Sequence, residues 1–235
     1  MTQTSDGTPA MAGQKSLIIF DLDGTLIDSA VDLAAAVNRM YGKLNLPTMP
    51  IDTIKSWVGN GSVKLVERAL AAHQQTAQQV DSQALSAAHE IFLAEYACCS
   101  TEQTQAYEGV SVGLNALVDA GYTLAICTNK PTRYLPEILA HFGWSDSFTI
   151  VIGGDSLAVK KPNPEPLLYI CQQLGILPKQ AVMVGDSKND ILAAQAANIT
   201  TLALRYGYNY GEPIDNTNPD MAFDDFNQLI ACLLR

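Results

Sequence analysis

The amino-acid sequence predicts an α/β fold, with a doubly wound, Rossmann-like parallel sheet as its core and an inserted helical cap domain. Two observations predict the core: short apolar runs alternate with helix-like segments, and polar or acidic residues directly follow four of those runs. Such alternation is typical of βαβ units, which build parallel sheets covered by helices on both faces. A third observation, a stretch of about 70 residues with only helical patterns, predicts the inserted domain.

The expected strands are short apolar runs bounded by turn-forming residues. The first is residues 17–20, and it ends in the acidic segment Asp21-Leu22-Asp23-Gly24-Thr25. An apolar run that leads into such a turn is typical of a buried strand. Later runs of the same character predict strands at 123–127, 148–152, 181–184 and 201–204, and the segments among them predict helices at 110–120, 133–142, 164–174 and 190–197.

The stretch between the first and second expected strands contains only helical patterns, expected at 30–44, 51–57, 62–73 and 81–99. In the last of these, an apolar stripe is formed at helical spacing by Leu85, Ala88, Ile91, Phe92 and Glu95. We therefore expect a helical cap domain at residues 29–100 and an α/β core made of residues 15–28 and 101–235. Residues 1–14 have no hydrophobic periodicity and are expected to form a disordered tail.

The composition excludes several classes of protein. The 235 residues include 14 Lys and Arg against 24 Asp and Glu, a formal net charge of −10, whereas binding nucleic acid through bulk charge needs a basic face. No apolar run reaches the roughly 18 residues of a membrane-spanning helix, and the polar N-terminus does not resemble a secretory signal. We expect a cytoplasmic monomer or weak homodimer that binds neither nucleic acid nor membrane.

The strand ends carry the residues that indicate chemistry. Side chains two apart in an extended segment point the same way, so Asp21 and Asp23 are expected to face one site. Asp186 and Asp190 follow a later strand, and ligands of parallel sheets bind at the carboxyl ends of the strands. Carboxylates are hard oxygen ligands, which predicts a Mg²⁺ site. The alternatives are that Asp23 belongs to an ordinary Asp-Gly turn and that Asp190 only caps a helix.

A charge balance predicts a second part of the site. A phosphate dianion approaches several carboxylates only if Mg²⁺ and a fixed cation compensate the negative charge. Lys161, before a proline and a helix, is the candidate cation, and the Thr128 hydroxyl with the backbone amides that follow is a candidate ligand for phosphate oxygens. The alternative for Lys161 is a solvated pair with Lys160 in a loop.

These segments resemble the four ordered motifs of the haloacid dehalogenase superfamily of phosphatases, over residues 17 to about 205. The motifs are Asp21-Leu22-Asp23-Gly24-Thr25, Thr128, Lys161-Pro162 and Gly185-Asp186-Ser187-Lys188-Asn189-Asp190. The helical stretch resembles the small helical cap of that superfamily. Residues 57–61, 128–132, 151–155 and 206–212 are similar to segments of bacterial phosphoglycolate phosphatases.

The resemblance implies a Mg²⁺-dependent phosphomonoester hydrolase that converts 2-phosphoglycolate to glycolate and phosphate. It implies that Asp21 is the nucleophile of an aspartyl-phosphate intermediate and that Asp23 is the general acid and base. Asp21, the backbone carbonyl of Asp23 and Asp186 would hold the metal. Asp190 would hold a metal-bound water or orient Lys161. Asp23 also argues against carbon–halogen hydrolysis, since a departing halide needs no proton.

Substrate choice is expected to come from the cap. Gly59, Asn60 and Gly61 lie between two expected cap helices, where glycines let the backbone approach a ligand, although a plain helix–turn–helix connection is the alternative. Asn129 follows the second strand and is a further candidate. A substrate carboxylate would need a cation, and the candidates are Lys43, Lys64, Arg68 and Lys130. Residues 26–30 and 100–108 are expected to be hinges.

Alternative functions remain open at this point. A phosphosugar phosphatase, a nucleotidase and a phosphosugar mutase share the four motifs, and a mutase must return the phosphoryl group to bound sugar before water intervenes. Of a different class, signalling receiver domains also have an acidic pocket at the strand ends of a parallel sheet. The inserted helices and the acid at Asp23 argue against a receiver domain, because a switch gains nothing from fast dephosphorylation.

Overall fold

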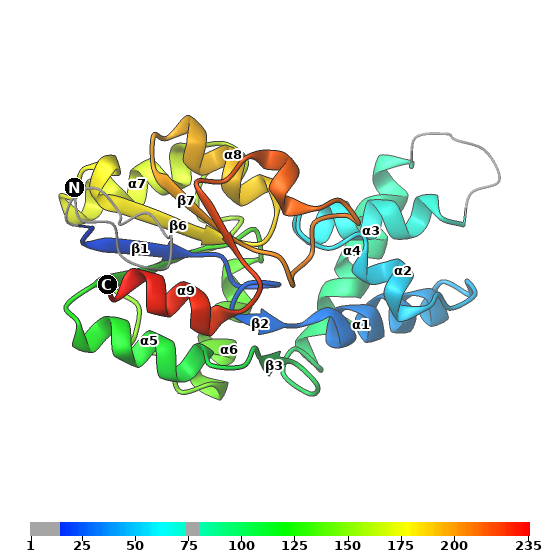
Figure 1. Cartoon of the computed structure of the whole chain (residues 1–235). Coiled ribbons are helices and arrows are strands. Elements are labelled where there is room, and N and C mark those ends of the chain that lie inside the picture. The colour runs from blue at the N-terminus through cyan, green and yellow to red at the C-terminus, as the bar shows by residue number, and fades with distance from the viewer. Residues whose placement is uncertain (1–14, 74–79) are drawn as a thin grey trace.

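The fold is that of a computed structural model, which describes residues 15–73 and 80–235. The tail predicted at residues 1–14 lies outside the described residues. A parallel sheet of six strands forms the centre of the α/β core, in the order β5-β4-β1-β6-β7-β8 (Figure 1). Its strands are β1 (Leu17–Phe20), β4 (Thr123–Cys127), β5 (Ile150–Ile152), β6 (Ala181–Gly185), β7 (Thr200–Leu204) and β8 (Met221–Phe223).

The register of the sheet places the end of β1 at its centre. Phe20, the last residue of β1, lies opposite Ile126 of β4 on one side and Val184 of β6 on the other. Asp21 continues this ladder, because its backbone N–H donates to the Val184 carbonyl at 2.9 Å. Residues that follow β1, β4 and β6 therefore meet at one edge of the sheet, as the sequence predicts.

Helices cover both faces of the sheet, and the predicted fold class is confirmed (Figure 1). Alternate residues of β1 pack to opposite sides: Ile18 and Phe20 belong to one apolar cluster, and Leu17 and Ile19 to another. The helices are α5 (Val110–Asp119), α6 (Leu135–His141), α7 (Glu165–Leu174), α8 (Lys188–Ala196) and α9 (Phe226–Leu233), with short 3-10 turns at Thr132–Tyr134, Pro178–Gln180 and Ile214–Thr217. The sequence analysis did not anticipate β8 and α9, which complete the sheet edge and one helical layer.

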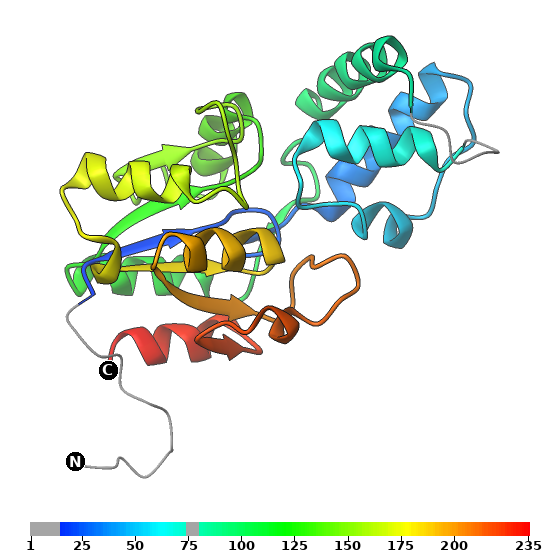
Figure 2. The ribbon, with the colours of Figure 1, turned by 90° about the horizontal axis from the view of Figure 1, so that it is seen from above.

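Four further helices form what we call the helical insertion: α1 (Ala30–Lys43), α2 (Ile51–Lys55), α3 (Ser62–Ala71) and α4 (Ser82–Ala97). Figure 2 shows them as a group beside the carboxyl ends of the strands. The buried residues of α4 are Ala88, Phe92 and Tyr96, whereas Leu85 and Ile91 of the predicted stripe are only partly buried. The helical character matches the prediction, and the cap-domain boundaries at 29–100 stay a prediction.

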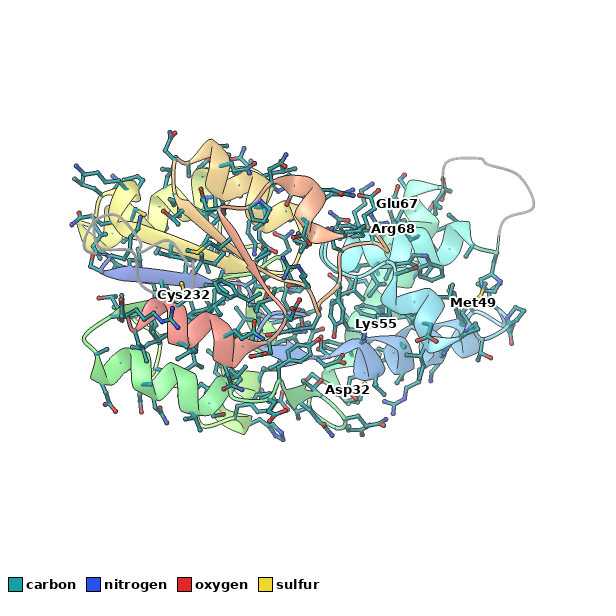
Figure 3. The ribbon with its side chains drawn as sticks, in the orientation of Figure 1. Asp32, Met49, Lys55, Glu67, Arg68 and Cys232 are labelled. Carbon is teal, nitrogen blue, oxygen red and sulfur yellow. The ribbon has the colours of Figure 1, made fainter. Side chains whose placement is uncertain are left out.

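Two chain segments connect the insertion to the core, and they are bound to each other. They form a short antiparallel pair, β2 (Ile27–Asp28) with β3 (Gln105–Ala106). Asp32, labelled in Figure 3, is fully buried and accepts hydrogen bonds from the backbone N–H groups of Gln103 and Thr104 at 2.8–3.0 Å. The β2–β3 pair lies within the two segments expected to be hinges, whereas Asp32 lies just beyond the first of them in α1, and bending of the hinges stays a prediction. Among the described residues, no helix combines the length and the apolar character that a bilayer crossing requires.

Candidate active site

Three buried carboxylates lie together at the carboxyl ends of β1 and β6. Asp21 follows β1, Asp186 follows β6, and Asp190 lies in the first turn of α8. One carboxylate oxygen from each lies within 4.8 Å of the others. These donors are all hard oxygens, which fits Mg²⁺ rather than a metal that prefers nitrogen or sulfur. The residues present therefore suit the cation expected from the sequence.

Lys161 compensates part of this negative charge. Its Nζ lies 2.5 Å from Asp190 Oδ1 and 3.1 Å from Asp21 Oδ1, and its side chain is 1% exposed. Burial lowers the pKa of Lys161, but Asp190 and Asp21 raise it by more, so the ammonium stays charged. The alternative of a solvated loop pair is therefore wrong for Lys161.

The single positive charge of Lys161 does not balance the negative charge of three ionised carboxylates in a buried group. Burial raises the pKa of Asp21 to about 7, with Lys161 opposing this shift and Asp190 adding to it. Burial also raises the pKa of Asp186, and both Asp190 and Asp21 raise it further. The ionised forms of Asp21 and Asp186 are therefore disfavoured in this buried group, and a bound divalent cation would favour them.

Asp190 makes two sets of contacts, so the alternative that it only caps a helix is wrong, and its role toward a metal-bound water stays a prediction. Its Oδ2 accepts hydrogen bonds from the backbone N–H and the hydroxyl of Ser187, at 3.0 and 2.7 Å, which caps the start of α8. Its Oδ1 faces Lys161 at 2.5 Å. The cap therefore fixes the carboxylate that orients the lysine.

Hydrogen bonds from two distant segments orient Asp186. Thr25 Oγ1 donates to Oδ1, and the backbone N–H of Tyr208 donates to Oδ2, each at 2.6 Å. The chain approaches so closely here that a Cβ atom on Gly24 or Gly207 would lie 2.2 Å from Asp186 Oδ2. The sequence analysis missed the contribution of Gly207 and Tyr208, because a backbone donor leaves no side-chain signal.

Gly207→Ala is expected to displace Asp186, because no Cβ atom tolerates a 2.2 Å approach to an oxygen. We expect the Mg²⁺ concentration for half-maximal activity to rise by about 10- to 100-fold, as for other losses of ligand positioning. The measurement is a Mg²⁺ titration of phosphate release. Gly42→Ala is the control, since its Cβ would contact nothing within 4 Å. An unchanged Mg²⁺ dependence would contradict the positioning role of Gly207.

The Asp23 side chain is not part of the group of three buried carboxylates and instead forms an ion pair with Lys130. Its Oδ1 accepts from Lys130 Nζ at 2.9 Å and from Ser29 Oγ at 2.5 Å. Lys130 is buried, and its Nζ also donates to the hydroxyl of Tyr96 on α4 at 2.6 Å. Gly24, which follows Asp23, has φ +89°, so an Asp-Gly turn is present as well. Asp23 thus lines the same cavity as Asp21 but belongs to a separate ion pair.

A cavity between the core and the insertion joins these groups. Thr128 is buried and lines this cavity together with Asp21, and its hydroxyl accepts from the Lys130 backbone N–H at 3.2 Å. Asn129 Nδ2 donates to the carbonyls of Gly59, at 3.2 Å, and Lys161, at 3.0 Å, which links the insertion to the core. The cavity is lined by Asp21, Asp23, Leu33, Val58, Gly59, Gly61, Ser62, Leu65, Phe92, Tyr96, Thr128, Asn129, Lys130, Pro131 and Tyr134.

The remaining predicted binding residues lie beside this lining. Arg68 donates to Asn60 Oδ1 and to the Trp57 carbonyl, each at 2.6 Å, and its guanidinium lies 5.2 Å from the centre of the Tyr210 ring. Figure 3 shows Arg68 where the insertion approaches the core. These contacts hold the loop that contains Gly59 and Gly61.

The four side chains considered as the cation for a substrate carboxylate lie in different places in the structure. Lys130 alone among them lines the cavity, in the part of the chain that the structure describes. Lys43 is exposed, and Lys64 pairs with Glu67 at 2.5 Å on the surface of α3. Tyr96 also lines the cavity, and the sequence analysis missed it because nothing in its local sequence distinguishes it from a packing residue.

Comparisons with known proteins agree with this geometry. The family model described as haloacid dehalogenase-like hydrolase matches residues 18–204. A protein of Psychrobacter arcticus named phosphoglycolate phosphatase is 52% identical over 94% of this chain and 96% of its own length. A protein of the same name from Colwellia psychrerythraea is 49% identical over 94% of this chain and 98% of its own length.

Solved structures give the same result. The structure of a predicted phosphoglycolate phosphatase from Haemophilus somnus is 39% identical, has a TM-score of 0.88, and is matched over 94% of this chain and 98% of that one. The family match covers most of this chain, including the segments that contain Asp21, Thr128, Lys161 and Asp186. This chain therefore belongs to the family of haloacid dehalogenase-like hydrolases.

Proposed function

We propose that this chain hydrolyses 2-phosphoglycolate to glycolate and phosphate, with Mg²⁺ as cofactor and an aspartyl-phosphate on Asp21 as intermediate. The observation that carries the proposal is the position of Asp21. Asp21 directly follows the central strand β1. Its carboxylate lies 3.1 Å from Lys161 Nζ and lines the same cavity as Asp23. Relatives named phosphoglycolate phosphatase, matched over nearly their full lengths, support the choice of substrate.

In the first step, an Asp21 carboxylate oxygen attacks phosphorus and the bond from phosphorus to the substrate oxygen breaks. That oxygen takes the proton of the Asp23 carboxyl group and leaves as the hydroxyl of glycolate. In the second step, water forms a bond to phosphorus, its proton passes to Asp23, and the bond to Asp21 breaks. Phosphate leaves, and both aspartates return to their starting forms.

The other site residues bind and neutralise. Asp21, Asp186 and the backbone carbonyl of Asp23 would hold Mg²⁺, with Asp190 orienting Lys161 or a metal-bound water. The bound cation would supply positive charge beside the phosphoryl oxygens. Lys161 and the Thr128 hydroxyl would bind the same oxygens, where the charge of a loose phosphoryl-transfer transition state accumulates.

Substrate binding involves the insertion. Gly59 and Gly61 line the cavity, and Asn129 links them to the core. In this proposal Asn60 and Arg68 act by holding that loop, because their polar atoms bind each other at 2.6 Å. The partner is a small phosphorylated molecule, and a cytoplasmic monomer or weak homodimer remains our expectation for the assembly.

The test is phosphate release from 2-phosphoglycolate beside a panel of sugar phosphates, nucleotides and pyrophosphate, with Mg²⁺ and with EDTA. We expect a preference of about 100-fold in kcat/KM for 2-phosphoglycolate, equivalent to about 2.7 kcal/mol of transition-state discrimination, and loss of activity in EDTA. A better sugar phosphate would overturn the substrate and leave the site chemistry intact. A sugar phosphate that rearranges without net phosphate release would instead indicate a mutase.

A further inference from the structure

Tyr96 brings a hydroxyl group from the insertion to the catalytic edge of the core. Its side chain is 1% exposed and is held by aromatic contacts, stacked on Phe92 at 5.8 Å and edge-on to Tyr134 at 4.9 Å between ring centres. The Tyr96 oxygen accepts a hydrogen bond from Lys130 Nζ at 2.6 Å. Burial raises the pKa of Tyr96 to about 12, so the hydroxyl keeps its proton at neutral pH.

The Tyr96–Lys130 pair can offer two hydrogen-bond donors to a ligand, one that is free and one that Asp23 now engages. An ammonium has three N–H groups, and those of Lys130 serve the Asp23 carboxylate, at 2.9 and 3.2 Å, and the Tyr96 oxygen. The O–H of Tyr96 finds no acceptor within residues 15–73 and 80–235, and an N–H of Lys130 becomes available when Asp23 gives up one of its two contacts. The two donor atoms lie 2.6 Å apart and both residues line the cavity. This spacing suits the two oxygens of one carboxylate.

The proposed substrate has a carboxylate near the same place. In 2-phosphoglycolate, one carbon separates the carboxylate from the ester oxygen, and Asp23 must reach that oxygen to protonate it. When the phosphoryl group contacts Asp21, the carboxylate therefore lies on the Asp23 side of the cavity. Lys130 is the cationic side chain that lines the cavity there, among the residues that the structure describes.

We propose that Tyr96 is a specificity-determining residue, which binds the carboxylate of the substrate together with Lys130. This inference rests on the proposed function. The substrate carboxylate competes with Asp23 for Lys130, so that Asp23 becomes able to turn toward the leaving oxygen. A phosphate ester without a carboxylate leaves Asp23 in its ion pair with Lys130. Because Tyr96 belongs to α4, the same contact also binds the insertion to the substrate.

The test is Tyr96→Phe, which removes the hydroxyl and keeps the ring that packs on Phe92 and Tyr134. The quantity measured is the ratio of kcat/KM for 2-phosphoglycolate to that for ethyl phosphate, which has no carboxylate. We expect this ratio to fall about tenfold, with most of the loss in KM for 2-phosphoglycolate. Lys130→Gln should lower the ratio further and weaken inhibition by glycolate. The matched control is Tyr41→Phe, which loses a buried hydrogen bond to the Ala69 carbonyl within the same insertion.

The outcomes separate this inference from the proposed function. If the wild-type protein prefers 2-phosphoglycolate and Tyr96→Phe keeps the wild-type ratio, the inference is overturned and the proposed function stands. If Tyr96→Phe lowers kcat/KM for both esters equally, the hydroxyl has a structural role and the inference is again overturned. A wild-type ratio near one would contradict the proposed function and the carboxylate site together.

Discussion

Asp21→Asn is expected to lower phosphate release from 2-phosphoglycolate by about 10⁴-fold or more. An amide has no anionic oxygen to attack phosphorus, so the covalent route through the aspartyl-phosphate is lost. Asparagine has nearly the same size and retains an oxygen that can accept the Leu22 backbone N–H, now 2.7 Å from Asp21 Oδ1. The measurement is phosphate release at saturating substrate and Mg²⁺. A variant with the wild-type rate would exclude Asp21 as the nucleophile.

The same substitution is expected to stabilise the metal-free protein at high pH. Burial raises the pKa of Asp21 to about 7, whereas an aspartate in an unfolded chain ionises near pH 4. Between about pH 4 and pH 7 the folded state therefore holds a proton that the unfolded chain has released. The free energy of unfolding consequently falls as the pH rises through this window.

Asparagine carries no charge, so the variant avoids this loss. In EDTA at pH 8 we expect its Tm to exceed that of the wild type by about 5 °C, and at pH 4 we expect the two Tm values to be nearly equal. Thermal unfolding followed by circular dichroism at both pH values is the measurement. Equal Tm values at pH 8 would show that ionised Asp21 does not destabilise the folded protein. Together with the lost activity, a raised Tm would separate the catalytic from the structural effect.

Lys161→Met is expected to lower both stability and activity. It removes the ammonium that lies 2.5 Å from Asp190 and 3.1 Å from Asp21, which leaves buried carboxylates without their cation. Breaking a buried pair from one side costs about 3–5 kcal/mol of unfolding free energy. Loss of one positive charge beside the phosphoryl oxygens should lower the rate by about 10³-fold.

Urea unfolding in EDTA measures the loss of stability in Lys161→Met. Phosphate-release kinetics with Mg²⁺, on a separate sample of folded protein, measure the loss of activity. The matched control is Lys160→Met, which changes the neighbouring lysine, a partly buried side chain outside the carboxylate group. We expect this control to change the unfolding free energy by less than about 1 kcal/mol. Equal stability losses for the two variants would contradict the charge-compensating role of Lys161.

Much of the α/β core follows from short-range sequence patterns. The strands predicted at 17–20 and 123–127 match β1 and β4, because strands buried in a parallel sheet are continuous apolar runs bounded by polar turns. The convergence of Asp21, Asp186 and Lys161 also follows, since parallel strands end at one edge. The strand predicted at 148–152 is shorter in the structure, where β5 spans Ile150–Ile152.

Contacts between the insertion and the core could not be predicted in this way. The buried face of α4 includes Tyr96, whereas the predicted stripe ended at the neighbouring Glu95. The apolar residues of α4 are spread over several faces of the helix. Helical spacing alone therefore does not indicate which face turns toward the cavity. For the same reason the sequence left four cations as candidates for a substrate carboxylate, and only the folded chain brings Lys130 to the cavity.

The sequence by itself determined the fold class, the family and the residues that follow each strand, because these depend on residue order and on the geometry of one parallel sheet. Tertiary structure alone decided how those residues pair. It placed Lys130 between Asp23 and Tyr96, and it brought the Tyr208 backbone N–H to Asp186. Such pairings join segments far apart in the chain, and only the packing of whole elements determines which of them meet.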